Sequence, residues 1–145
     1  MIDPVFINRK IDYIKRDLVR LKEFKTLTFE KAAKDWKNYS AIKNLLMEVV
    51  GRGIDINQHL ITELARVEMM APLDYTQTFL KLSELGVLPE KFAKQISKSA
   101  GFRNAIVHGY NDLDKWTVYR SVGDALKEYT QYCGCILKFL SKSKK

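Results

Sequence analysis

Apolar side chains recur every three or four positions along most of this 145-residue chain. That spacing gathers them on one face of an α-helix, and no segment shows the strict alternation of a half-buried strand. The chain is therefore expected to be all-α, an antiparallel bundle of four main helices with short extra helices. The two clearest apolar series are Ile7, Ile11, Ile14, Leu18 and Leu21 near the start, and Tyr119, Val122, Leu126, Tyr129, Cys133, Ile136 and Leu140 near the end.

Capping and helix-breaking residues divide this pattern into segments. Asp3-Pro4 is a start signal for the first helix, and Asp74 followed by Gln77 resembles a capping box. Gly86 and Gly109 are typical of positions just beyond a helix end. In chain order, the pattern predicts a first helix after Pro4, a short helix from Thr28 to Trp36, a long helix from Tyr39 to about Ala65, a helix from Asp74 to Gly86, a helix from Pro89 to Gly109, and a last helix carrying the series from Tyr119 to Leu140.

The composition is that of a globular protein. Hydrophobic residues make up 46% of the chain and charged residues 29%, which excludes intrinsic disorder. The length fits one domain over residues 1–145, with residues 138–145 as a basic C-terminal tail. No apolar run approaches the roughly 20 residues that cross a bilayer, and the N-terminus lacks the pattern of a signal peptide. We expect a cytoplasmic protein that does not associate with membranes.

The two cysteines, Cys133 and Cys135, agree with that compartment. Because they lie two positions apart on a helix, they point about 200° away from one another and cannot easily form a disulfide. Two sulfurs without a nearby histidine also make a zinc site an unfavourable interpretation. We predict no metal and no other cofactor.

The formal net charge is +8, and the basic surplus sits toward the two ends of the chain. Such a balance favours polyanionic partners such as RNA, although a basic surface that only keeps the protein in solution is the alternative. The basic residues of the first helix interleave with Asp12, Asp17 and Glu23, which is typical of a solvated face. We interpret Trp36 and Trp116 as packing residues rather than base-stacking platforms.

Gly51 and Gly53 fall inside the long third helix, where each should cost about 1 kcal/mol relative to alanine. Either another helix backbone approaches closely at these positions, or the helix breaks there. The approaching helix could belong to this chain or to a second copy.

The stretch from Gly101 to Tyr110 concentrates side chains that can perform chemistry. Arg103 offers a planar charged fork that suits phosphate oxygens, and His108 can take and return a proton near neutral pH. Asn104 shares a helix face with His108, whereas Arg103 and His108 would diverge by about 140° on a straight helix. Their convergence requires the length of arginine, a turn at Gly109, or a second copy of the chain. In the purely structural alternative, the histidine interacts with the helix dipole and the arginine pairs with a carboxylate.

A second polar stripe follows the third helix at Glu48, Arg52, Asp55 and His59. Its spacing of four, three and four residues is that of a solvated ladder of charge pairs. Alternatively, Asp55 and His59 line a cleft and hold Arg103 or His108 in place. A metal site here is disfavoured because the stripe lacks a convergent fourth ligand.

The pattern Arg103-x4-His108-x-Tyr110 resembles the R-x4-H-x-Y signature of the HEPN superfamily, in its HepT-like toxin branch. Asn104 fits, because a polar residue is usual after the arginine of that signature. The segments Asp55–Ile61, Leu85–Pro89 and Gly101–Asn104 also resemble the corresponding parts of these proteins. The resemblance extends over about residues 5 to 140.

This resemblance implies a homodimer that brings two copies of the motif into one cleft and cleaves RNA without a metal. The ribose 2′-hydroxyl would attack the adjacent phosphorus and leave a 2′,3′-cyclic phosphate, a reaction that DNA cannot undergo. His108 would act as general base or acid, Arg103 would stabilise charge on the phosphorane, and Asn104 would orient the phosphate or His108.

The resemblance also implies a protein partner. HepT-like toxins are paired with a minimal nucleotidyltransferase antitoxin that can attach AMP to the motif tyrosine, which is Tyr110 here. Two other interpretations remain. In the first, the chain is a non-catalytic binding subunit of a nucleotidyltransferase complex, and Arg103, His108 and Tyr110 bind phosphate without cleaving RNA. In the second, it is a structural bundle.

Overall fold

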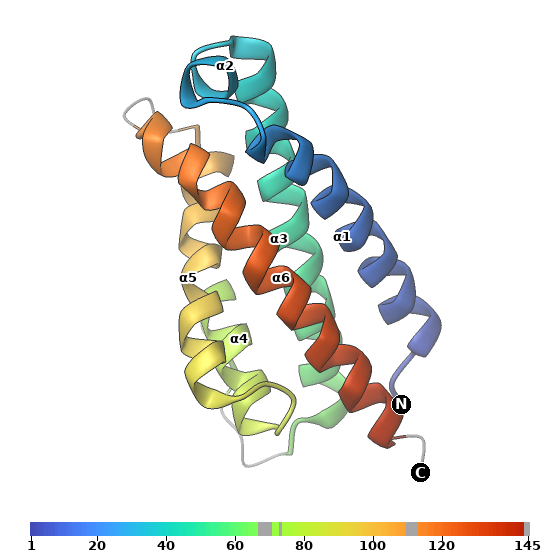
Figure 1. Ribbon diagram of the computed structural model, residues 1–145. Coiled ribbons are helices and arrows are strands. Elements are labelled where there is room, and N and C mark those ends of the chain that lie inside the picture. Colours follow the sequence, from blue (N-terminus) through green and yellow to red (C-terminus); the bar gives the residue numbers. More distant parts are fainter. Residues whose placement is uncertain (67–70, 73, 110–112, 144–145) are drawn as a thin grey trace.

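The computed structural model describes residues 1–66, 71–72, 74–109 and 113–143. Within these ranges the chain forms six α-helices and no strand, which confirms the all-α prediction. Helices α1, α3 and α6 lie along one another, and α4 and α5 form a hairpin against α3 (Figure 1). The helices are α1 (Pro4–Lys25), α2 (Phe29–Ala33), α3 (Trp36–Leu64), α4 (Tyr75–Glu84), α5 (Glu90–Val107) and α6 (Lys115–Ser143). None of the helices described here combines the length and the apolar character of a membrane span.

Aspartate side chains accept hydrogen bonds from the first amides of α1, α3, α4 and α6. Oδ1 of Asp3 accepts hydrogen bonds from the amides of Val5 and Phe6, and Oδ1 of Asp74 accepts one from the amide of Gln77. These side chains satisfy amide groups that have no partner within the helix. The predicted starts of the first and fourth helices are therefore confirmed.

The boundary between the second and third helices differs from the prediction. The short helix ends at Ala33, and α3 begins at Trp36 rather than at Tyr39. The cause is Asp35, whose carboxylate accepts hydrogen bonds from the amides of Lys37 and Asn38 and so starts a new helix one turn early. Trp36 thus opens α3 instead of ending α2. Its side chain is 73% exposed, so the interpretation of Trp36 as a packing residue is wrong.

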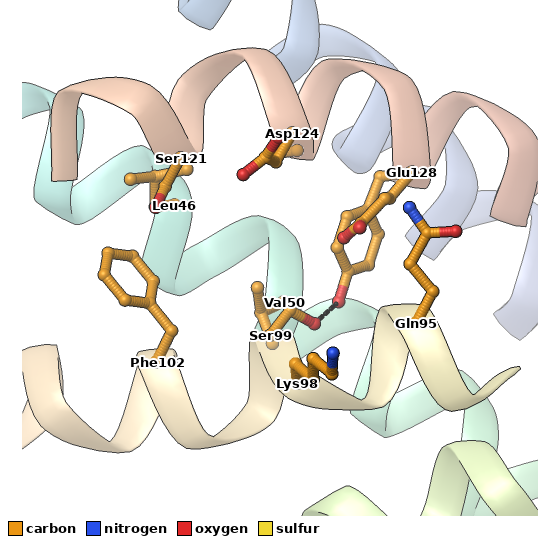
Figure 2. Close-up of a pocket in the computed structure, with 11 residues that line it drawn as sticks. Leu46, Val50, Gln95, Lys98, Ser99, Phe102, Ser121, Asp124 and Glu128 are labelled. Atoms are coloured by element: carbon orange, nitrogen blue, oxygen red, sulfur yellow. Dashed lines mark hydrogen bonds between the residues drawn. The ribbon is translucent and has the colours of Figure 1, made fainter. Parts of the chain in front are cut away.

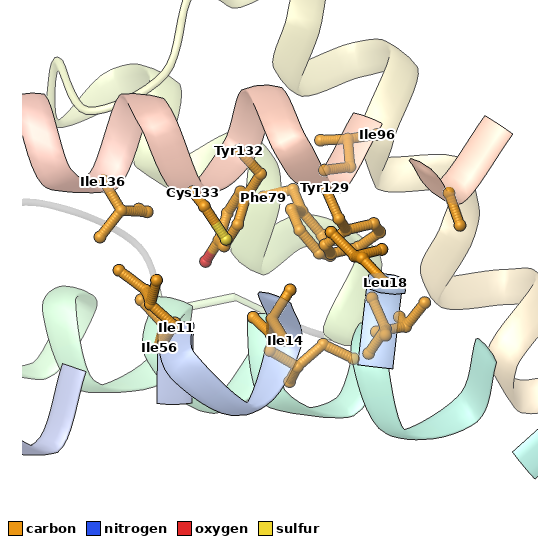
Figure 3. Close-up of a cluster of buried hydrophobic side chains, with 14 of the residues drawn as sticks. Ile11, Ile14, Leu18, Ile56, Phe79, Ile96, Tyr129, Tyr132, Cys133 and Ile136 are labelled. Carbon is orange, nitrogen blue, oxygen red and sulfur yellow. The ribbon is translucent and has the colours of Figure 1, made fainter. Parts of the chain in front are cut away.

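The predicted apolar series meet in one continuous core. Ile11, Ile14 and Leu18 of α1 face Ile56 of α3 and Ile136 of α6, as Figure 3 shows. Helices α4 and α5 add buried side chains such as Phe79 and Ile96 from the other side of α3. The complete burial of these positions stabilises the bundle by roughly 1.5–3 kcal/mol for each large side chain.

A chain of buried polar groups crosses this core. The Tyr132 hydroxyl of α6 lies within hydrogen-bond distance of the Gly53 carbonyl, at 3.0 Å, and of the Asn57 side-chain oxygen. The Asn57 amide in turn donates to Oγ1 of Thr78 in α4, at 3.0 Å. Because an unsatisfied buried polar group is costly, these bonds fix how α3, α4 and α6 sit relative to one another.

Helix α3 continues without a break through both of its glycines, and an aromatic side chain explains the second of them. A Cβ atom at Gly53 would lie only 3.0 Å from Cε1 of Tyr129. The alternative of a helix break is therefore wrong, and the group that approaches Gly53 is a ring of α6 rather than a helix backbone.

Asp17 of α1 is 1% exposed, so its assignment to a solvated face is wrong. Its carboxylate pairs with Arg52 of α3, and also with Arg20 at 3.3 Å and Arg16 at 3.8 Å. The Arg52 guanidinium lies over the ring of Tyr13 as well, with 4.9 Å between Cζ and the ring centroid. This network joins α1 to α3 through charge rather than through apolar contact.

Stability should fall in alkaline solution because the core buries groups that must stay protonated. Burial raises the pKa of Cys133 from its ordinary value of 9.0 to about 11, and burial also raises the pKa values of Tyr129 and Tyr132. A pKa raised in the folded state gives stability that is complete below the unfolded-state pKa and declines above it. The free energy of unfolding should therefore be constant near neutrality and decline above about pH 9, by up to about 1.4 kcal/mol per pH unit for each group.

Urea titrations in one-unit pH steps measure this decline. Cys133→Ala removes the thiol, so the pH at which the free energy of unfolding begins to decline should rise toward the range in which the tyrosines titrate. A profile that stays flat at high pH would contradict the assignment of these three groups as neutral in the folded protein.

Candidate active site

Arg103 lies on the side of α5 that faces the middle of α3. A Cβ atom at Gly51 would sit 3.3 Å from Nε of Arg103 and 3.7 Å from its Nη2, so the missing side chain of Gly51 makes room for the guanidinium. The Cζ atom of Arg103 is also 5.7 Å from the ring centroid of Tyr75, at the start of α4. Three helices therefore hold Arg103, and Gly51 is a site residue whose role the sequence analysis missed.

Among the residues that the structure describes, Arg103 makes no ion pair. Its Nε is buried and has no hydrogen-bond partner in this part of the chain. The two carboxylates nearest along α3 are already engaged, Glu48 with Arg52 at 3.0 Å and Asp55 with Lys10 at 2.9 Å. No described carboxylate thus pairs with Arg103, which differs from the carboxylate pairing that the structural alternative expects, and within this part of the chain its charge can attract an external anion.

An open hollow of about 290 Å³ lies beside this guanidinium. Its charged lining consists of the cations Lys10, Arg52 and Arg103 and the carboxylates Glu48 and Asp55. Because Asp55 pairs with Lys10 and Glu48 with Arg52, the net positive charge of the hollow comes from Arg103. An arginine beside a shallow, solvent-open depression suits a phosphate group, since its planar fork matches phosphate oxygens.

His108 occupies the C-cap of α5. Its amide donates to the carbonyl of Asn104 at 3.0 Å, and Gly109 follows with a positive φ of 62° that turns the chain away. His108 is exposed, whereas Asn104 and Arg103 are half-buried. Arg103 lines the hollow, and His108 is not among its lining residues. Tyr110 lies outside the described residues.

Asp55 and His59 find their partners in the N-terminal part of the chain. Asp55 pairs with Lys10 of α1 and lines the same hollow as Arg103. His59 accepts a hydrogen bond at Nε2 from the amide of Asp3 at 3.0 Å, and it lines a neighbouring hollow together with Asp55. The structure thus brings Asp55 to the candidate site and places His59 one turn further from it. In the described part of the chain, no group of three or more histidine, cysteine or acidic side chains could hold a metal ion.

A narrower pocket of about 220 Å³ lies between α5 and α6, away from these residues (Figure 2). Leu46 and Val50 of α3 lie at its floor, where Ser99 and Tyr129 share a hydrogen bond of 2.7 Å. Burial raises the pKa of Glu128 at its edge. Neither Arg103 nor His108 lines this pocket, so we place the site at the hollow beside Arg103 and not here.

Comparison with known proteins identifies the family. Residues 14–136 match the family described as Ribonuclease HepT-like. The tRNA nuclease HepT of Aphanizomenon flos-aquae is 30% identical over 141 residues, which are 96% of this chain and 92% of that protein.

Solved structures agree with this fold at lower sequence identity. A tri-AMPylated HEPN toxin of Shewanella oneidensis in complex with its MNT antitoxin gives a TM-score of 0.79 at 22% identity, over 92% of this chain and 97% of that one. YutE of Bacillus subtilis, described as a cytosolic protein of unknown function, gives a TM-score of 0.82 at 17% identity, over 98% of this chain and 93% of that one. The match over residues 14–136 and the full-length relative together show that this chain belongs to the HepT-like ribonuclease family.

Proposed function

We propose that this protein is a metal-independent endoribonuclease toxin that cleaves tRNA and is silenced by a minimal nucleotidyltransferase antitoxin. The observation that carries the proposal is Arg103, an arginine with a buried Nε and no ion pair among the described residues, beside an open cationic hollow. Family membership adds support, and tRNA is chosen because the relative from Aphanizomenon flos-aquae is a tRNA nuclease. We place this activity in the cytoplasm.

RNA supplies its own nucleophile, so the protein needs only proton transfer and charge neutralisation. The 2′-oxygen forms a bond to the adjacent phosphorus, and the bond from phosphorus to the 5′-oxygen breaks. The products are a 2′,3′-cyclic phosphate and a 5′-hydroxyl. His108 takes the proton of the 2′-hydroxyl or gives one to the departing 5′-oxygen. Arg103 neutralises the charge that builds on the phosphorane, and Asn104 orients the phosphate or His108.

Two copies of the chain would complete this site. His108 is exposed at the end of α5, while Arg103 points toward α3. A two-fold axis near the end of α5 would let each histidine approach the arginine of the other copy across one RNA strand. We therefore propose a homodimer as the active form.

In the proposed antitoxin reaction, the hydroxyl oxygen of Tyr110 loses its proton and bonds to the α-phosphorus of ATP, the bond to the β-phosphate breaks, and pyrophosphate leaves. The support is the similar Shewanella oneidensis HEPN toxin, which is AMPylated and bound to an MNT antitoxin. Phosphate groups added two residues after His108 would compete with RNA for the cationic hollow.

Replacing Tyr110 with phenylalanine should abolish this modification, because the acceptor oxygen is gone. Intact-protein mass spectrometry after incubation with the antitoxin, ATP and Mg²⁺ measures AMP attachment. The wild type and His108→Ala should both accept AMP, and Tyr110→Phe should not. The Tyr110→Phe toxin should also keep cleaving RNA after that incubation, whereas AMP attachment to Tyr110→Phe would contradict the assignment.

Cleavage of purified tRNA in EDTA tests the proposed function. The wild type should leave cyclic phosphate ends, and His108→Ala should be slower by about 10²–10⁴-fold, the usual contribution of a general acid or base. His108→Gly with added imidazole should recover part of the rate if the histidine transfers a proton. Circular dichroism confirms that each variant is folded. A wild-type protein that binds the nucleotidyltransferase but cleaves nothing would instead be the non-catalytic binding subunit.

A further inference from the structure

Exposed aromatic side chains gather at the end of the bundle where α2, the start of α3 and the start of α6 meet (Figure 1). Trp36 opens α3 and is 73% exposed, and Trp116 in the first turn of α6 is 47% exposed. Large exposed tryptophans are unusual on a soluble surface and often mark a binding site. We call this surface the aromatic end. It consists of the exposed Trp36 and Trp116 and of three half-buried rings, those of Phe29, Tyr39 and Tyr119.

Three rings of the aromatic end, those of Phe29, Trp116 and Tyr119, are held in place by one another and by the backbone. Phe29 meets Trp116 edge to face, with 5.0 Å between the ring centroids, and Trp116 lies 5.8 Å from Tyr119. The Tyr119 hydroxyl donates a hydrogen bond of 2.6 Å to the carbonyl of Leu27. Rings fixed in this way lose little conformational entropy when a ligand stacks on them.

Lysines surround these rings. Nζ of Lys37 lies 5.8 Å from the ring centroid of Trp36, and Nζ of Lys43 and of Lys115 lie 4.7 Å and 5.3 Å from that of Tyr39. None of the three lysines has a carboxylate partner among the residues described by the structure. Their charges attract anions to the same surface as the rings.

Two acidic side chains at this end, Asp35 and Asp114, accept hydrogen bonds at the N-termini of α3 and α6. Asp35 accepts hydrogen bonds from the first amides of α3. Asp114 accepts one from the Thr117 hydroxyl, at 2.8 Å, and one from the amide of Trp116. Neither carboxylate forms an ion pair with the three lysines among the residues described, so these two charges offset the lysines only in part.

The aromatic end lies beyond His108 on the path that leads away from Arg103. Gly51 stands opposite Arg103, and α3 and α5 run antiparallel (Figure 1). His108 lies five residues after Arg103 in α5, which is about 7.5 Å along the helix axis. Tyr39 lies twelve residues before Gly51 in α3, which is about 18 Å along the axis in the same direction. The aromatic end is therefore about 10 Å further along the bundle than His108. One strand passing His108 could therefore reach the rings with its next nucleotides.

We propose that the aromatic end binds unpaired nucleotides of the RNA substrate, those that lie beyond His108 of the same chain. Aromatic rings interleaved with lysines suit single-stranded nucleic acid, because every base has a face for stacking and every linkage carries a negative charge. A paired strand cannot offer its base faces. The choice of RNA as the ligand rests on the proposed function, and the surface would give the nuclease a preference for unpaired segments.

The test separates binding from cleavage by using an uncleavable 2′-deoxy single-stranded oligonucleotide with a fluorescent label. Trp36→Ala in the full-length protein should raise the Kd, measured by fluorescence anisotropy, by about 10-fold, and Trp36→Phe should recover most of the loss. Trp116→Ala should act in the same direction. Val5→Ala is the matched control, since Val5 is 67% exposed at the opposite end of the bundle. Its Kd should stay within about 2-fold of the wild type, which is the usual effect of a surface change.

The same variants are then compared in cleavage of a single-stranded RNA. We expect Trp36→Ala to raise KM by about 10-fold with kcat nearly unchanged. Equal Kd and KM values for Trp36→Ala and the wild type would overturn the inference and leave the nuclease assignment intact. A wild type that cleaves nothing but binds through Trp36 would overturn the nuclease assignment alone. A Trp36→Ala variant that binds RNA normally but no longer binds the nucleotidyltransferase would overturn the inference in favour of a protein-docking surface.

Discussion

Replacing Arg103 with alanine should lower the rate of RNA cleavage by about 10²–10³-fold, the usual effect of removing one group that stabilises charge in a transition state. The same replacement should leave the stability unchanged or raise it. Nε of Arg103 is buried without a hydrogen-bond partner among the described residues, so the folded protein already carries the cost of an unsatisfied donor. Removing the side chain removes that cost. Activity should therefore fall without any loss of stability.

Single-turnover cleavage and urea unfolding of the same preparation measure the two effects of Arg103→Ala. Arg103→Lys should recover only part of the rate, because a point charge does not reproduce the planar fork of a guanidinium. Lys142→Gln near the end of α6 removes one positive charge outside the site and serves as the control. A large loss of stability in Arg103→Ala, with activity falling only as the protein unfolds, would support the structural alternative instead.

The largest expected effect on stability belongs to Arg52→Ala, which should reduce the free energy of unfolding by about 3 kcal/mol. Asp17 is 1% exposed and pairs with Arg52, which is itself only 19% exposed. Without Arg52, the buried carboxylate of Asp17 keeps only Arg16 and Arg20 as partners, and about half of each of these side chains is exposed to solvent. For a chain of this size, such a loss lowers Tm by about 6–12 °C.

Arg20→Ala is the matched control for this prediction. Arg20 pairs with the same carboxylate at 3.3 Å, but its side chain is 55% exposed. Its removal should cost less than about 1 kcal/mol, as for other exposed ion pairs. Urea unfolding with an unchanged m-value is the measurement. Equal losses in the two variants would show that burial of the arginine does not determine the strength of the pair.

The sequence was sufficient to predict the helical class and most helix boundaries, because a three- and four-residue apolar spacing has no other common explanation. The sequence was misleading at Trp36, because a tryptophan there suggested the apolar end of the short second helix. In the structure, the side chain of Asp35 caps the first amides of α3, so Trp36 belongs to α3. The sequence was also misleading at Asp17, since a charge on a helix looks solvated until the partner helix places Arg52 against it.

The candidate site was predictable in its chemistry but not in its arrangement. The spacing of Arg103, Asn104 and His108 indicates proton transfer and phosphate binding from one helix end. The room that Gly51 leaves for Arg103 could not be predicted, because 52 residues separate the two positions and only the packing of α5 on α3 joins them. The orientation of Asp55 toward Lys10 depends on α1 in the same way.

The two glycines of α3 lie two residues apart and therefore point to nearly opposite faces of the helix. Gly53 leaves room for a ring of the core, whereas Gly51 leaves room for the candidate catalytic arginine. A side chain at position 53 should therefore disturb the packing of the core, whereas one at position 51 should displace Arg103 and affect the proposed activity. The same helix thus separates the requirements of the fold from those of the candidate site, and a chain changed at Gly51 should keep an intact bundle.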